Sequence, residues 1–357
     1  MKPDNTPTWL SAHLYYNEPW EQFLTEAVLP FADIVMRTGI AQSFFFIRYW
    51  ERGPHIRLRF RVESEKLQTI FEPNLEEHFK NYFDSRPSLR TEPKYPPGFP
   101  KDYKWHPNNT FRYETYEPEL KRYGGVEGVK IAEEQFQASS RVVLESMLDK
   151  AGRWSYDDAL GLAIKLHLSF VHSVGMSKEE ACQFFESYFE NWLPSAFEFK
   201  LKNASNKEKE KQKKEKLNAF NDAYILQKKS LIAYHKTMWD HLESEDDFDD
   251  KLLRDWISSN KLIGLKLRTA QQDEQLNPRS KLHRYTFKDG PSANFELWEH
   301  YADYIHMTNN RLGVLNQDEG YLGFLMMKCM NEMGGMEESS DDSGEEAPPE
   351  THFFLSF

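Results

Sequence analysis

The sequence predicts an α+β fold: a ferredoxin-like antiparallel sheet with two helices over residues 1–125, then a large helical part over residues 126–333. Strand and helix patterns alternate up to Gly124-Gly125, and the patterns after this glycine pair are helical. The composition, 39% hydrophobic and 15% aromatic, can supply a large core, so disorder of the whole chain is excluded. We expect the helical part to pack on the open face of the sheet and to complete a cleft.

The first 125 residues contain four strand candidates and two helix candidates. The strands are expected at residues 9–16, 43–50, 55–62 and 111–116, and the helices at residues 18–37 and 64–83. The middle strands are separated by Glu51-Arg52-Gly53-Pro54, which has the composition of a turn. The order strand, helix, strand, strand, helix, strand is that of the ferredoxin-like fold. A proline-rich excursion over residues 86–109 interrupts it and has no assigned role.

The second part of the chain is predicted to be helical throughout. Helices are expected at residues 127–150, 155–172, 177–192, 207–242, 247–267, 292–312 and 320–333. Ser177 followed by Glu180 is typical of a capping box at a helix start. Residues 200–216 hold eight lysines against three glutamates, which favours a solvated helix end over a docking site for an acidic peptide. Residues 334–357 form an acidic tail that we expect to be disordered.

Charge and cysteine content exclude several classes of protein. The net charge is −12, which makes general binding to nucleic-acid backbones unfavourable. Cys182 and Cys329 are far apart, so neither a disulfide framework nor a zinc knuckle is expected. The first ten residues have no apolar core of a secretion signal, and no apolar run approaches the ~20 residues that span a bilayer. We expect a cytoplasmic protein without a membrane anchor.

One predicted strand carries a row of cations. Alternate side chains of a strand share a face, so four basic residues line one face and four apolar residues the other. The basic set is His55, Arg57, Arg59 and Arg61, and the apolar set is Ile56, Leu58, Phe60 and Val62. Either protein carboxylates neutralise the arginines, or the row binds an anionic ligand through paired hydrogen bonds. Whether Arg48 joins the row across the hairpin depends on a strand register that the sequence does not define.

Two further stretches place polar residues where they could line a binding site. Residues 116–125 place Arg122 and Tyr123 just before Gly124-Gly125, and the glycine pair permits close approach of the backbone. His306 and Asn310 lie one helical turn apart and share a face. Each stretch alone is weak, because a lone helical histidine is usually a satisfied structural residue. No metal-ligand spacing, phosphate loop or nucleophile elbow is present, so neither a metal nor a cofactor is expected.

Taken together, three blocks of the sequence resemble the C-terminal elimination domain of class I lantibiotic dehydratases. The blocks are Phe45-Phe46-Ile47-Arg48-Tyr49 with His55-Ile56-Arg57-Leu58-Arg59, then Tyr116-Glu117-Pro118-Glu119 with Arg122-Tyr123-Gly124-Gly125 and Ala132-Glu133-Glu134-Gln135-Phe136, then Ile305-His306-Met307 with Asn310-Arg311-Leu312. They follow one another in the family's order, and the resemblance runs over about residues 9–333. The same family includes stand-alone thiopeptide-type bacteriocin biosynthesis proteins.

The resemblance implies an activity and its residues. It implies that serine or threonine of a ribosomal precursor peptide is glutamylated by a separate tRNA-dependent protein, and that a protein of this kind then expels glutamate to leave dehydroalanine or dehydrobutyrine. The implied catalytic residues are Arg57, Arg59, Arg122 and His306. The implied substrate-binding residues are Arg48, His55, Tyr123, Asn310 and Arg311. The arginines of the hairpin and His306 are then expected to meet in one pocket, with His306 acting as base or as acid.

Three alternatives remain open from the sequence. A pyridine synthase of thiopeptide biosynthesis, which joins two dehydroalanines, is a relative within the same family. A non-catalytic subunit that docks the precursor peptide is a second alternative, and a generic helical interaction protein is a third. The implied partners are the precursor peptide and the glutamylating protein, with no direct contact to nucleic acid. The oligomeric state, for which a homodimer is one option, is left open.

Overall fold

The computed structural model describes residues 6–91, 93–150, 152–196, 204–244, 248–279 and 295–336. They form two compact units, which are described separately below. The first unit comprises residues 6–118 and 136–154, and the second comprises residues 119–135 and the described residues from 155 onward. One helix, α5 (Gly125–Asp149), contributes its first turns to the second unit and its later turns to the first.

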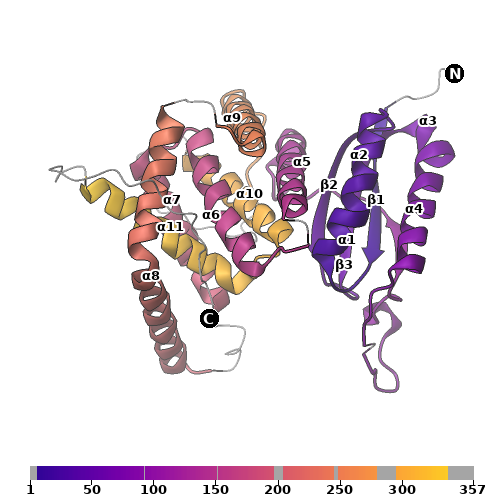
Figure 1. Cartoon of the computed structure of the whole chain (residues 1–357), viewed down its shortest axis with the longest axis horizontal. Helices are drawn as coiled ribbons and strands as arrows, with labels where there is room; N and C mark the ends of the chain where they lie inside the picture. Colours follow the sequence, from indigo (N-terminus) through magenta and orange to yellow (C-terminus); the bar gives the residue numbers. More distant parts are fainter. Residues whose placement is uncertain are drawn as a thin grey trace. The chain divides into compact units, whose positions relative to one another are not determined.

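The first unit is built on a four-stranded antiparallel sheet (Figure 1). Its strands are β1 (Pro7–Tyr15), β2 (Ala41–Tyr49), β3 (His55–Glu63) and β4 (Thr110–Glu114). Their spatial order is β2-β3-β1-β4, and each neighbouring pair is antiparallel. This order confirms the predicted ferredoxin-like sheet.

Each predicted helix of the first unit contains a short π-helical turn. The first consists of α1 (Trp20–Phe23), η1 (Leu24–Val28) and α2 (Leu29–Arg37); the second consists of α3 (Ser64–Lys66), η2 (Leu67–Phe71) and α4 (Glu72–Ser85). Pro30 and Pro73 follow the π turns at helix starts. Because proline has no N–H to donate, the regular hydrogen-bond ladder is interrupted there.

Aromatic packing joins these helices to one face of the sheet. The ring of Phe60 on β3 lies 5.6 Å from that of Phe31 and 5.0 Å from that of Phe71, measured between centroids. Such edge-to-face and tilted pairs add to the free energy gained by burying the rings. This face therefore forms the core of the first unit, and the other face is left to polar and aromatic side chains.

The later turns of α5 cover the edge strand β2. The backbone N–H of Phe46 donates to Oγ of Ser140 at 3.2 Å, and the ring of Phe136 lies 5.3 Å from that of Phe45. Arg141 forms an ion pair with Asp33 of α2. An uncovered edge strand could pair with another chain, so this helix protects the sheet.

The second unit is helical, as predicted. In addition to the start of α5, it contains α6 (Tyr156–Ser173), α7 (Lys178–Trp192), α8 (Asn206–Glu243), α9 (Lys251–Gln272), α10 (Trp298–Leu312) and α11 (Asn316–Met336), with short 3-10 turns η4 (Leu193–Ala196) and η6 (Phe295–Leu297). A third such turn, η3 (Lys101–Tyr103), belongs to the proline-rich excursion of the first unit. The capping box of Ser177 and Glu180 is confirmed.

Helix α10 is largely enclosed by its neighbours. Twelve of its 15 side chains are buried, including Asp303 and Arg311. Polar groups in such surroundings are costly unless they are hydrogen-bonded, so their partners define the local structure. Helices α11 and α7 approach closely at Gly323, where a Cβ atom would lie 3.0 Å from the Cα atom of Phe189.

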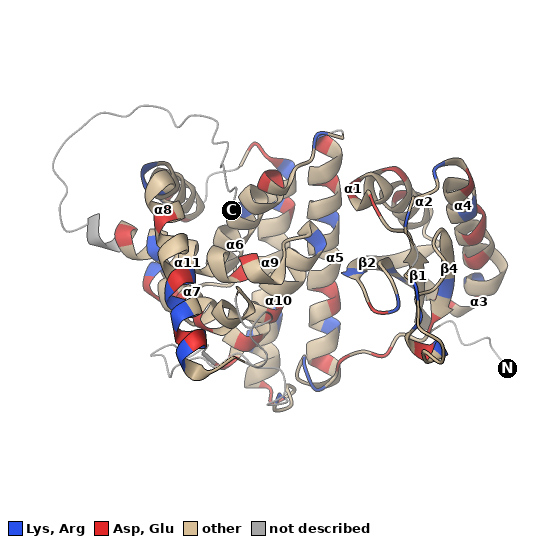
Figure 2. Cartoon of the chain, turned by 90° about the horizontal axis from the view of Figure 1, so that it is seen from below, with Lys and Arg blue, Asp and Glu red and all other residues tan. Residues whose placement is uncertain are grey.

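The lysine-rich segment forms the first turns of α8, and most of its side chains are exposed from Asn206 to Lys216. Figure 2 shows that lysine and arginine are interspersed with aspartate and glutamate on the helices of this unit. None of the described helices is long and apolar enough to cross a membrane. Residues 200–203 and the acidic tail from 337 onward lie outside the described residues.

Candidate functional site

The first group of candidate residues lies on the face of the sheet opposite helices α2 and α4. In the register of β1 and β3, Arg57 pairs with His13 and Arg59 pairs with Ser11. The alternating apolar residues of β3, which are Ile56, Leu58, Phe60 and Val62, are fully buried. The predicted division of β3 into a cationic face and an apolar face is therefore confirmed.

Aromatic rings hold both arginines of this cationic face. The guanidinium carbon of Arg57 lies 3.4 Å from the centroid of the Tyr49 ring. That of Arg59 lies 4.6 Å from the ring of Tyr116 and 5.3 Å from the ring of Phe45. Stacking on an aromatic face orients a guanidinium without neutralising its charge. Oε2 of the exposed Glu51 lies 3.4 Å from Nη2 of Arg57.

Neutral histidines accompany these arginines. Nδ1 of His55 is 2.8 Å from the carbonyl oxygen of Gly53, and Nε2 of His55 accepts a hydrogen bond from Nε of Arg57 at 3.2 Å. Burial, with a further contribution from Arg57, lowers the pKa of His55 to about 4. Burial and the adjacent His55 lower the pKa of His13 to about 3. At neutral pH the positive charge of this face therefore belongs to the arginines.

Arg48 lies on the other face of the sheet. It pairs with Ile56, and directly opposed residues of an antiparallel pair share a face. Its side chain is 4% exposed, and Nη1 donates to Oε1 of Glu21 at 2.7 Å. Arg48 therefore does not lie on the face of Arg57 and Arg59. Its ion pair joins β2 to helix α1, and its expected role in substrate binding stays a prediction.

The second group of candidate residues surrounds Asp303 in the second unit. Nε and Nη2 of Arg122 donate to Oδ1 of Asp303 at 3.0 and 2.7 Å. Arg279 donates to Oδ2 of the same carboxylate, which is 1% exposed. The ring of Tyr123 stacks on that of Tyr304 at 6.4 Å, and burial raises the pKa of Tyr123. Arg279 was not foreseen, because no local pattern in the sequence marks it.

The glycine pair explains how two distant arginines reach one carboxylate. Gly124 and Gly125 have φ values of +73° and +94°. The N–H of Asn277 donates to the carbonyl of Gly124 at 2.8 Å, and a Cβ atom on Gly125 would lie 2.4 Å from Nδ2 of Asn277. The expected close backbone approach at this pair is confirmed. It brings residues 277–279 beside the turn that carries Arg122.

His306 is the centre of a third group, also in the second unit. Its Nδ1 lies 2.8 Å from Oε1 of Glu319, and its ring stacks on Trp192 with centroids 4.8 Å apart. Glu319 is 1% exposed; its Oε2 accepts hydrogen bonds from the hydroxyl of Tyr188 at 2.5 Å and from Nδ2 of Asn309 at 3.1 Å. Glu319 and Tyr188 were missed, because their proximity to His306 depends on the packing of α7, α10 and α11.

The other two candidates of α10 differ in exposure. Asn310, one turn from His306, is half-buried. Arg311 is fully buried, and its Nη1 donates to the carbonyl oxygen of Met307 at 2.7 Å. Arg311 is therefore part of the interior of α10 and its neighbours, whereas the side chain of His306 keeps 19% of its surface exposed.

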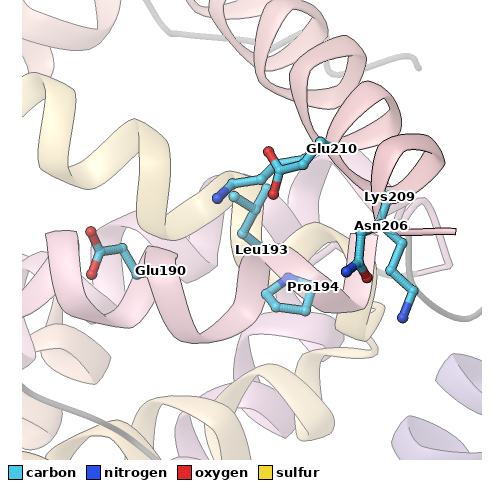
Figure 3. Close-up of a pocket in the computed structure, with 7 residues that line it drawn as sticks. Glu190, Leu193, Pro194, Asn206, Lys209 and Glu210 are labelled. Carbon is cyan, nitrogen blue, oxygen red and sulfur yellow. The ribbon is translucent and has the colours of Figure 1, made fainter.

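The three groups of candidate residues were compared with possible metal-binding clusters and with a pocket of the second unit. Within the described ranges, no three histidine, cysteine, aspartate or glutamate residues are grouped to hold a metal ion. A pocket of about 350 Å³ lies where the end of α7 and η4 meet the first turns of α8 (Figure 3). Its lining residues are Glu190, Leu193, Pro194, Asn206, Lys209, Glu210 and Lys213. None of them is a predicted site residue.

Comparison with known proteins identifies structural relatives. The pyridine synthase TbtD from thiomuracin biosynthesis has 17% identity and a TM-score of 0.69, over 92% of this chain and 99% of that protein. TsrL has 16% identity and a TM-score of 0.61, over 92% and 96% of the two chains. The tRNA-dependent lantibiotic dehydratase MibB from Microbispora sp. 107891 has 17% identity and a TM-score of 0.55, over 95% of this chain but 29% of that one.

At these identities the structures establish a shared fold. None of the curated proteins matches the chain. The family model described as lantibiotic biosynthesis dehydratase C-term matches residues 9–330. That range includes the cationic face of β3, the Arg122 turn and His306. The chain therefore belongs to the lantibiotic biosynthesis dehydratase C-terminal family.

Proposed function

We propose that this protein eliminates glutamate from O-glutamylated serine or threonine residues of a ribosomally made precursor peptide. The observation that carries the proposal is the arrangement of Arg57 and Arg59, which lie against aromatic rings on one sheet face. Paired guanidinium groups suit carboxylates, and a glutamyl ester presents a free carboxylate before and after its release. The product is dehydroalanine from serine or dehydrobutyrine from threonine.

The chemistry requires three contributions. A base removes the proton from Cα, cations stabilise the enolate-like charge that develops, and the Cβ–O bond breaks so that glutamate departs. A positioned base contributes about 10²–10⁴-fold in rate. Preorganised cations at developing charge contribute a comparable factor or more. We assign charge stabilisation and carboxylate binding to Arg57 and Arg59, with Arg122 as a further cation, and proton transfer to His306.

The proposed partners follow from the same reaction. The substrate is a precursor peptide that a separate, tRNA-dependent protein has glutamylated, and we propose that both proteins act in the cytoplasm, where charged tRNA is available. MibB, whose name describes a tRNA-dependent lantibiotic dehydratase, supports this proposal, because 95% of the present chain shares the fold of a part of it. The net charge of −12 fits a protein that handles the peptide but not the tRNA.

The test is a reaction with purified glutamylated precursor peptide, read by mass spectrometry. The parent protein should release glutamate, and R57A, R59A and H306A should each lower the rate by about 100-fold or more. R61A is the matched control, because Arg61 is an exposed residue of the same strand. If the three site variants release glutamate at the parent rate, or if the parent protein releases none, the proposal is wrong.

The similarity to TbtD supports a second candidate, formation of a pyridine from two dehydroalanines. TbtD matches over 99% of its own length, whereas MibB matches over 29%. A peptide that already carries two dehydroalanines distinguishes the two activities. A pyridine synthase would convert it into a cyclic product with a new ultraviolet absorbance, whereas a glutamate-eliminating enzyme would leave it unchanged.

A further inference from the structure

We infer that Glu319 is a positioning residue that keeps the imidazole proton of His306 on Nδ1, so that Nε2 of His306 is the atom that accepts the Cα proton. The inference rests on the proposed elimination and deepens it, because it assigns His306 as base and not as acid. Glu319 itself contacts neither the peptide nor the leaving group in the proposed reaction. Its role is to orient the imidazole and to stabilise the imidazolium that forms.

The hydrogen bonds around Glu319 set the tautomer. Oε2 of its carboxylate accepts from the hydroxyl of Tyr188 and from Nδ2 of Asn309. An ionised carboxylate can only accept hydrogen bonds, so the contact of 2.8 Å between Oε1 and Nδ1 of His306 requires a proton on Nδ1. A neutral imidazole with its proton on Nδ1 has its lone pair on Nε2.

Packing fixes the plane of the ring. The imidazole of His306 stacks on the indole of Trp192 at an interplanar angle of 27°. Helix α10 ends at Leu312, and the C-cap residue Gly313 has the left-handed conformation, with a φ of +84°, three residues before α11 begins. This short connection brings Glu319 back beside His306. Nε2 forms no hydrogen bond with any described residue, and the side chain remains 19% exposed.

The step is balanced without any further reactant. The proton on Cα moves to Nε2 of His306, and the electron pair of the Cα–H bond forms the Cα=Cβ double bond. The Cβ–O bond breaks, and its electron pair leaves on the carboxylate oxygen of glutamate. His306 becomes an imidazolium that is held by the negative charge of Glu319, as in other catalytic pairs of histidine and carboxylate.

The expected behaviour of E319Q differs according to whether Glu319 is purely structural or positions His306. In E319Q the side chain keeps its volume and can still hydrogen-bond, so the packing of α7, α10 and α11 should survive. The glutamine amide can, however, donate to Nδ1 and thereby stabilise the tautomer with the proton on Nε2, which is unable to accept the substrate proton. The two roles are therefore separated by the kinetics and by the tautomer.

The experiment compares the parent protein with E319Q, H306A and the control D318N. Asp318 is adjacent to Glu319 but accepts from the hydroxyl of Tyr156 at 2.6 Å, so D318N changes a carboxylate without changing the His306 contact. With a glutamylated peptide, E319Q should lower kcat by about 100-fold or more with KM changed by less than about threefold. D318N should retain the parent rate.

Nuclear magnetic resonance of 15N-histidine-labelled protein reads the tautomer without any reaction. The signal of His306, assigned as the one missing from H306A, should show a protonated Nδ1 in the parent protein and a loss of that state in E319Q. A parent protein with its proton on Nε2 overturns the inference, even if E319Q fails to fold. If H306A is inactive while E319Q keeps the parent kcat, the inference fails and the proposed function stands. If the parent protein releases no glutamate, the proposed function fails, and with it the role of Nε2 as base.

Discussion

Nε of Arg57 donates a hydrogen bond to Nε2 of His55 on the cationic face of β3, across 3.2 Å. This bond exists only while Nε2 of His55 is unprotonated, and the carbonyl of Gly53 holds the ring from its other nitrogen. The orientation of an arginine that we assign to the substrate carboxylate therefore depends on a neutral histidine. Acid should disturb this face before it disturbs the apolar core.

The first prediction concerns the pH dependence of stability. The pKa of His55 is about 4 in the folded protein and about 6.5 in an unfolded chain, so the unfolded chain binds more protons between these values. The unfolding free energy should therefore fall as pH is lowered from about 6.5 towards about 4. By pH 5, His55 alone should account for a loss of up to about 2 kcal/mol. Urea denaturation at pH 7.5 and pH 5 measures this loss.

The variant H55Q supplies the comparison for this prediction, because glutamine can accept a hydrogen bond but does not titrate. The loss of stability between pH 7.5 and pH 5 should be smaller in H55Q than in the parent protein. Between pH 7.5 and pH 8.5 both proteins should change equally. If the unfolding free energies of H55Q and the parent protein fell equally by pH 5, His55 would not be protected from protonation in the folded state.

The second prediction separates Arg48 from the other arginines. R48A removes a buried guanidinium that pairs with Glu21 and lies 5.6 Å from the ring centroid of Trp20. We expect a loss of about 2 kcal/mol in unfolding free energy, because a buried ion pair is broken but Glu21 can reach water. The rate of glutamate release per folded molecule should be unchanged. A variant of parent stability that has lost elimination would contradict this placement of Arg48.

Sequence patterns predicted the features that depend on local geometry. The alternation along β3 follows from the two-residue period of a strand, so the separation of Arg57 and Arg59 from Leu58 and Phe60 could be foreseen. The conformation at Gly124-Gly125 could also be foreseen, because only glycine adopts positive φ without strain. Both predictions required no knowledge of distant contacts.

Features that depend on tertiary packing could not be predicted in this way. The face occupied by Arg48 depends on the register between β2 and β3. A shift of one residue moves every side chain of the strand to the other face of the sheet. Arg279 forms an ion pair with Asp303, and Asn277, two residues before it, packs on the glycine turn. Glu319 meets His306 through the short connection between two helices. No periodicity marks these residues, and their partners lie in other elements.

The third prediction tests the packing at the glycine turn. G125A places a side chain at a φ of +94° and within 2.4 Å of Nδ2 of Asn277. G152A is the matched control, because Gly152 has a φ of +77° and a Cβ atom there would contact nothing within 4 Å. We expect G152A to lower the unfolding free energy by about 1 kcal/mol through backbone strain alone. G125A should cost more than G152A, because the side chain of Asn277 must also move aside. Equal losses in thermal or urea denaturation would show that this contact adds nothing to the backbone strain.

The fourth prediction concerns the carboxylate that Arg122 and Arg279 share. D303N keeps the shape of the side chain but removes the negative charge between two guanidinium groups, of which Arg279 is 8% exposed. We expect a loss of about 3 kcal/mol in unfolding free energy, because the buried Arg279 and the half-buried Arg122 then lack their common counter-ion. E119Q is the control, because Glu119 also pairs with Arg122 but is 56% exposed. The unfolding free energy of E119Q should therefore fall by less than about 1 kcal/mol. Elimination, measured as glutamate released per folded molecule, should fall in D303N and persist in E119Q. Equal effects of the two variants on stability and on rate would mean that Asp303 does not position Arg122.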